Sequence, residues 1–107
     1  MLNVTSANYD KEVKESTTPV IVDFWAEWCG PCRMMIPVFE GLSSQYEGKL
    51  KFAKVNTEEE PVIAQNAQIR GIPCLIIFNN GEEFDRIVGF MPEPMLKQKI
   101  DQILARI

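Results

Sequence analysis

The chain has 107 residues, enough for one domain spanning 1–107, and 11 Lys and Arg against 15 Asp and Glu give a net charge of −4. This acidic balance, without a basic patch or stripe, argues against a nucleic-acid partner. No apolar run approaches the roughly eighteen residues of a membrane span, and the N-terminus lacks the pattern of a secretory signal, so we expect no membrane association.

The first predicted elements are a short edge strand at 2–4 and a helix at 6–16 with Tyr9 and Val13 on one face. Pro19 ends this helix. The following run, 20–26, is nearly all apolar, as expected for a strand that is covered on both faces.

A turn containing two cysteines follows that strand, with the sequence Trp28-Cys29-Gly30-Pro31-Cys32. Pro31 suits the first position of a helix, where a missing N–H costs little. Apolar residues then recur at helical spacing and predict a core-facing stripe of Met34, Met35, Val38, Phe39 and Leu42. We expect Cys29 at the exposed tip of this helix and Cys32 facing the interior. Pro37 should kink the helix and Gly48 should end it.

The second half of the chain begins with an alternating strand at 50–56. The acidic run 58–60 is most simply the solvated start of a helix at 61–68. Strands at 74–78 and 84–88 are joined by Asn80-Gly81, a strong hairpin signal.

A final helix after Pro94 carries a stripe that indicates core packing, formed by Leu96, Ile100, Ile103, Leu104 and Ile107. From the strand at 20–26 onwards, the element order βαβαββα predicts an α/β fold, a central mixed sheet with helices on both faces.

The two cysteines of the turn are spaced to form and break a disulfide with each other. The thiolate is the nucleophile in disulfide exchange, and a helix N-terminus stabilises this anion at Cys29. The helix dipole contributes about 0.3 to 1 kcal/mol, or roughly one pKa unit at most, so a larger shift needs hydrogen bonds to the sulfur. The spacing predicts that Cys29 attacks a substrate disulfide and that Cys32 resolves the mixed disulfide.

Two other kinds of protein could carry such a motif. A zinc or iron–sulfur site normally needs four Cys or His ligands, and this chain has three Cys and no His. Only a site shared between chains would remain, so we expect no bound metal. A non-catalytic binding module is the other alternative, and it would tolerate the loss of either cysteine.

Beyond the motif, the chain resembles the thioredoxin family over essentially its whole length. The matching residues, in order, are Asp23–Cys32, Lys54, Gly71-Ile72-Pro73, Asn80-Gly81 and Val88-Gly89. The resemblance implies the thioredoxin-like fold and a general protein-disulfide reductase of cell redox homeostasis. It also implies a monomer without bound cofactor, disulfide-containing client proteins, and recharging by a thioredoxin reductase. The direction of electron flow comes from the resemblance, through Gly30 and Pro31 between the cysteines.

Asp23 stands in the middle of the apolar strand, where an ionised carboxylate is costly unless it is paired or neutralised. From the residues alone, a structural buried acid tied to Lys54 on the neighbouring strand is favoured. The resemblance implies instead that Asp23, with Lys54, moves the proton of Cys32.

Pro73 follows Ile72, and only about 5–6% of such bonds are cis in folded proteins, so trans is the default. The resemblance implies a cis bond packed against the disulfide, with the backbone of Ile72 pairing with an extended substrate segment. A flat apolar patch beside Cys29 would then be rimmed by Trp28, Ile72, Gly89 and Phe90. A core position is the alternative for Trp28, and we assign Trp25 to the core.

Cys74 departs from the commonest thioredoxin pattern, which often has threonine after the proline. A buried cysteine behaves as a small hydrophobe, and a regulatory thiol near the active pair is the alternative. Three cysteines, two of them in one motif, fit a reducing compartment, so we expect the cytoplasm. A periplasmic protein whose signal peptide has been removed would show the same pattern.

Overall fold

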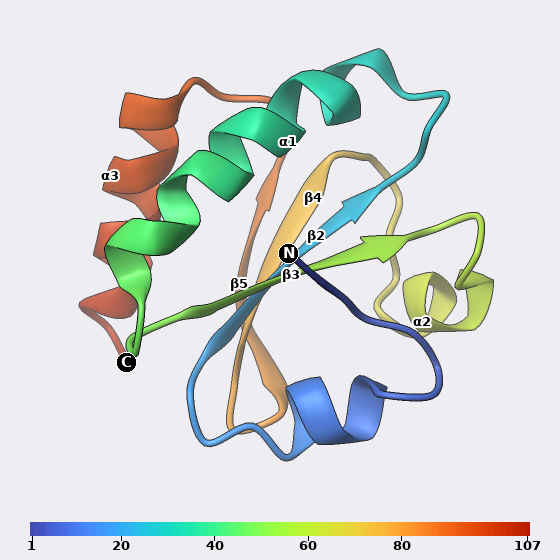
Figure 1. Cartoon of the computed structure of the whole chain (residues 1–107), viewed down its shortest axis with the longest axis horizontal. Coiled ribbons are helices and arrows are strands. Elements are labelled where there is room, and N and C mark those ends of the chain that lie inside the picture. Colours follow the sequence, from blue (N-terminus) through green and yellow to red (C-terminus); the bar gives the residue numbers. More distant parts are fainter.

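One five-stranded sheet runs through the middle of the computed structural model, which describes residues 1–107 (Figure 1). Its strands, in the spatial order β1-β3-β2-β4-β5, are β1 (Leu2–Asn3), β3 (Lys51–Asn56), β2 (Val20–Trp25), β4 (Cys74–Asn79) and β5 (Glu82–Val88). The first three strands are parallel, while β4 runs antiparallel to β2 and β5 antiparallel to β4. The predicted mixed sheet is confirmed.

Helices cover both faces of this sheet. The helices α1 (Gly30–Ser43) and α3 (Glu93–Leu104) lie on one face, and α2 (Pro61–Asn66) and a π-helical turn, η1 (Asp10–Lys14), lie on the other (Figure 1). The order from β2 onwards is βαβαββα, as predicted.

The central position of β2 explains its apolar sequence. Successive side chains of a strand point to opposite faces, and here Ile21 packs in the core beneath α1 and α3 while Val22 packs in the core beneath α2 and η1. Asp23, two residues after Ile21, therefore lies on the α1 face. An acidic side chain is thus placed between the middle of the sheet and the helix that carries the cysteines.

Three helices are shorter than the sequence predicts, since α1 ends at Ser43 and not at Gly48, α2 ends at Asn66 and not at residue 68, and the first helix is reduced to a short turn. The first is only η1, because a turn at 6–8 precedes it, in which the amide oxygen of Asn8 accepts a hydrogen bond from the Thr5 N–H at 2.7 Å. Tyr9 and Val13 nevertheless pack against the same core, as predicted.

The helix α1 contains Pro37 and ends at Ser43, and a 3₁₀ turn, η2 (Ser44–Tyr46), leads on to Gly48. Tyr46 is buried, and its hydroxyl donates to Asp101 at 2.6 Å. This contact ties the end of α1 to α3.

Two residues predicted to lie in the core are on the surface. Met35, Phe39 and Leu42 are buried in α1, but Met34 is 59% exposed, and Ile107 lies beyond the end of α3 with 46% exposure. Both belong to stripes whose other members pack as predicted, so the stripes are narrower than the spacing alone suggests. None of the helices combines the length and the apolar character that crossing a bilayer requires.

Candidate active site

The two cysteines of the turn form a disulfide at the carboxyl end of β2, so the protein is in its oxidised form. Cys29 is the N-cap residue of α1 and Cys32 lies in its first turn, with the two Cα atoms 5.2 Å apart. The sulfur of Cys29 accepts a hydrogen bond from the backbone N–H of Cys32 at 3.2 Å. A free helix N–H thus already points at the sulfur that would carry the negative charge after reduction.

The pair is largely covered by its surroundings. Cys32 is 0% exposed, as predicted, but Cys29 is only 5% exposed and is less open than an exposed helix tip. Half-buried Ile72 packs against the disulfide, and its carbonyl oxygen lies 3.8 Å from the Cys29 sulfur. The segment that contains Ile72 therefore covers one side of the Cys29 sulfur.

That segment contains the cis bond that the resemblance implies, between Ile72 and Pro73 at the start of β4. Pro73 is buried, and its carbonyl oxygen accepts a hydrogen bond from the Gly89 N–H at 2.9 Å. Gly89 has φ +95°, which disfavours other residues, and a side chain there would meet nothing within 4 Å. The space over Gly89 is open beside the segment that faces Cys29.

Trp28 is 69% exposed, so the alternative of a core position for it is wrong, and Phe90 is 39% exposed. The indole N–H of Trp28 donates to Glu58 at 2.6 Å. Sequence reasoning missed this contact, because the acidic run that contains Glu58 was assigned to solvent. The pairing could have been found from the sheet, since β2 and β3 are parallel and the residues that follow them meet at one edge.

Asp23 is 0% exposed, and neither of its carboxyl oxygens has a hydrogen-bond partner. Its neighbour on β3 is Lys54, as predicted. The Lys54 ammonium, however, is bonded to Glu40 of α1 at 2.9 Å, and lies 5.5 Å from the centre of the Trp25 ring. Asp23 is therefore buried beside Lys54, as the sequence suggests, but it is not hydrogen-bonded to Lys54 in this form, and Glu40 is a residue that the sequence did not indicate.

Burial raises the pKa of Asp23 from its ordinary value of 3.8 to about 7, with Lys54 lowering it and Glu40 raising it further. An ionised carboxylate without a partner loses its hydration in the interior, and protonation relieves that cost. Asp23 therefore exchanges its proton near neutral pH, where general acid–base groups work best.

Cys74 is 1% exposed and packs in the core beneath α2 and η1. Burial raises the pKa of its thiol, and the positive charge of Arg86 opposes this only in part. A buried cysteine held as a thiol is a small apolar side chain, so the structure favours that interpretation over the regulatory one. Trp25, assigned to the core, is half-buried, with its indole N–H buried and unpartnered.

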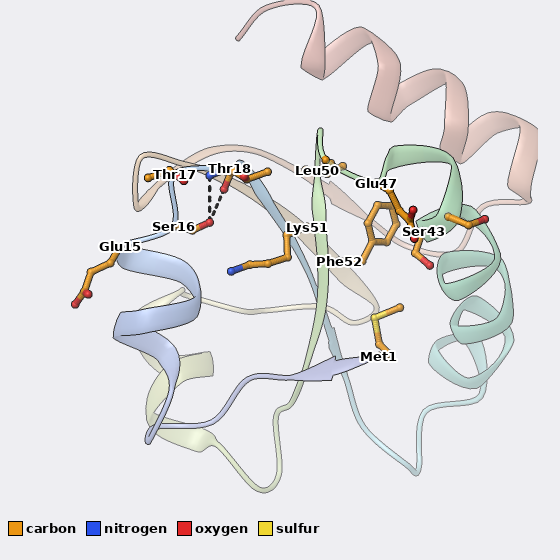
Figure 2. Close-up of a pocket in the computed structure, with 12 residues that line it drawn as sticks. Met1, Glu15, Ser16, Thr17, Thr18, Ser43, Glu47, Leu50, Lys51 and Phe52 are labelled. Atoms are coloured by element: carbon orange, nitrogen blue, oxygen red, sulfur yellow. Dashed lines mark hydrogen bonds between the residues drawn. The ribbon is translucent and has the colours of Figure 1, made fainter.

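Two further features lie apart from the cysteines. A cavity of about 660 Å³ is lined by residues that precede β2, end α1 and begin β3, among them Ser16, Ser43 and Lys51 (Figure 2). It lies at the amino ends of β2 and β3, whereas the disulfide follows the carboxyl end of β2. No three Cys, Asp or Glu side chains are grouped so that they could hold a metal ion.

Comparison with protein families matches residues 1–102 to the family described as thioredoxin. A protein named Thioredoxin 1 from Nostoc sp. (strain PCC 7120 / SAG 25.82 / UTEX 2576) is 48% identical over 101 residues, which cover 94% of each chain. A thioredoxin of Synechocystis sp. is 46% identical over 94% of each chain. The chloroplastic M-type thioredoxin of Pisum sativum is 44% identical over 94% of this chain and 59% of its own. The chain therefore belongs to the thioredoxin family of thiol–disulfide oxidoreductases, and the Cys29–Cys32 pair is its redox centre.

Proposed function

We propose that Cys29 attacks and Cys32 resolves during the reduction of client disulfides. The Cys29 thiolate attacks one sulfur of the client disulfide, and the other client sulfur leaves as a thiolate that takes up a proton. Cys32 then loses its proton and attacks the Cys29 sulfur, which releases the second client thiolate. Two electrons pass to the client, and the Cys29–Cys32 disulfide remains. The observation that carries this proposal is the hydrogen bond from the Cys32 N–H to the Cys29 sulfur, because it stabilises a thiolate at that position only.

Asp23, acting with Lys54, is the group that accepts the Cys32 proton in this scheme. A pKa of about 7 makes its carboxylate available as a base at neutral pH while keeping the proton easy to return. The family resemblance supports the same role.

The client docks on the surface next to Cys29. An extended client segment would pair with the backbone of Ile72, beside Pro73, as an added strand, with its own backbone close to Gly89. The open space over Gly89 and the exposed rings of Trp28 and Phe90 support this placement, since they offer an apolar rim around a covered sulfur. Gly30 and Pro31 keep the two cysteines at disulfide spacing on the first turn of α1.

The protein acts on disulfide-containing client proteins, and its electrons come from a thioredoxin reductase rather than from a bound cofactor. We further propose that residues 1–107 form one thioredoxin domain that works as a monomer in the cytoplasm. The family match over residues 1–102 supports the single domain.

The order of attack is tested by trapping. Cys32→Ser should accumulate a disulfide adduct between Cys29 and a client, because the resolving thiol is absent. Cys29→Ser should form none, and Cys74→Ser should reduce a model protein disulfide at the rate of the unaltered protein. The products are followed by non-reducing electrophoresis and mass spectrometry. An adduct through Cys32 in the Cys29→Ser variant, at a similar yield, would reverse the assignment.

A further inference from the structure

The charged side chains near Asp23 do not balance. Two carboxylates, those of Asp23 and Glu40, face one ammonium, that of Lys54. The ammonium is bonded to Glu40, whose side chain is 40% exposed, while the fully buried Asp23 has no hydrogen-bond partner. A cation is usually worth more to a buried carboxylate than to a partly solvated one, so this arrangement favours an uncharged Asp23.

The position of Glu40 connects this pair to the redox centre. Glu40 lies on α1, eight residues after Cys32, which is about two helical turns. The side chain of Lys54 is only 14% exposed, and its ammonium lies against the Trp25 ring. Lys54 is therefore confined between the sheet and α1. The Glu40 side chain thus extends from the helix that carries the cysteines to Lys54, the cation beside Asp23.

We propose that Glu40 is a positioning residue that holds Lys54 away from the Asp23 carboxylate and thereby sets the pH at which Asp23 gains and loses its proton. When Asp23 ionises, Lys54 can turn from Glu40 to Asp23, and when Asp23 is protonated, Lys54 returns to Glu40. The proposal deepens the proposed function, because its consequence for disulfide exchange rests on Asp23 accepting the Cys32 proton.

Few other groups could produce the same effect. On the elements packed against Asp23, the facing charges are Lys54 of β3 and Glu40 of α1. The neighbour of Asp23 on β4 is Leu75, and α3 contributes apolar side chains to this core. Cys29 and Cys32 do not titrate in the oxidised form. The thiol of Cys74, on the other face of the sheet, stays protonated because burial raises its pKa.

The test is an NMR titration of the Asp23 carboxyl carbon in the oxidised protein, where no active-site thiol interferes. Glu40→Gln should lower the midpoint by about one pH unit, because the released Lys54 then stabilises the ionised carboxylate. The matched control is Glu47→Gln, which removes the same charge from an exposed residue near the end of α1. It should leave the midpoint unchanged.

The role of Lys54 is tested by repeating Glu40→Gln in a Lys54→Gln background, where most of the shift should disappear. A rise of the midpoint in Glu40→Gln, a shift equal to that of Glu47→Gln, or a full shift in the Lys54→Gln background would each overturn the proposal. The pH profile of exchange separates it from the proposed function. If the Asp23 midpoint falls but the pH profile does not move, Asp23 is not the base for Cys32, and the coupling through Glu40 stands.

Discussion

Asp23 is a residue of the candidate site whose burial lowers the free energy of unfolding at neutral pH. An aspartate in an unfolded chain ionises near 4, whereas in the folded protein Asp23 does so at about 7. Between these values the folded state binds a proton that the unfolded state has lost, so the free energy of unfolding falls as the pH rises. The contribution of the protonated Asp23 to the free energy of unfolding is complete below pH 4 and is lost by about pH 7.

Asp23→Asn should therefore change the pH dependence of stability. The free energy of unfolding of the unaltered oxidised protein should fall by up to about 1.4 kcal/mol per pH unit between pH 4 and 7, relative to the variant. Above pH 7 the difference should be constant, with the variant more stable. Urea denaturation at several pH values measures this. Parallel curves for the two proteins would show that Asp23 titrates normally despite its burial.

Whether a residue of the site could be predicted from the sequence depends on whether its signal is local. The disulfide partners Cys29 and Cys32 and the buried Asp23 were predictable, because a motif and a charge within an apolar strand are local signals. Glu40 was not, because its importance depends on which side chains the fold brings together. Glu40 meets Lys54 only because α1 crosses the face of the sheet where β3 presents that residue.

At the scale of elements, most strands and helices agree with the prediction because their signals are local too. The hairpin between β4 and β5 is the best example, since Asn80 and Gly81 have φ 55° and 82°, the left-handed values that a tight hairpin turn requires. The first helix is shorter than predicted, because residues 6–8 form a turn and only η1 is regular. Gly81 adds a constraint that a turn signal cannot show. A Cβ there would lie 2.6 Å from the backbone oxygen of Lys14.

Gly81→Ala should accordingly destabilise the protein more than the same substitution at a turn glycine with open space around it. Its left-handed backbone costs about 1–2 kcal/mol with a side chain, and displacing the backbone of η1 costs about 1–3 kcal/mol more. Gly48→Ala is the matched control, since Gly48 has φ +78° but open space around it. Gly48→Ala should lower the free energy of unfolding only by the cost of the left-handed backbone, about 1–2 kcal/mol. Chemical denaturation compares the two, and equal losses would mean that η1 moves aside without cost.

The sheet divides the interior of the protein into two cores and leaves the redox centre at one end. The core beneath α1 and α3 and the core beneath α2 and η1 both pack against β2. The cysteines pack with Ala26 in a small third cluster just beyond that strand. Because the rigid sheet holds β2 in place, opening the disulfide should change the stability of the molecule without changing its fold.

Reduction of the protein should therefore lower its free energy of unfolding while the native state persists. The disulfide closes a loop of four residues, from Cys29 to Cys32, and the loss of this constraint on the unfolded chain corresponds to about 2 kcal/mol. By linkage, the disulfide should be about thirty-fold harder to reduce in the folded protein than in the unfolded chain. Denaturation with and without a small dithiol reductant measures the first quantity.

A variant in which both Cys29 and Cys32 are serine provides the control, since it keeps Cys74 and should show no response to the reductant. If the oxidised and reduced forms were equally stable, the two free thiols would have to stabilise the folded state by as much free energy as the unfolded chain gains when the disulfide is opened. The hydrogen bond from the Cys32 N–H to the Cys29 sulfur would supply such stabilisation once Cys29 is a thiolate. The difference in stability should then narrow as the pH rises, which makes the pH dependence of the oxidised-minus-reduced difference the decisive measurement.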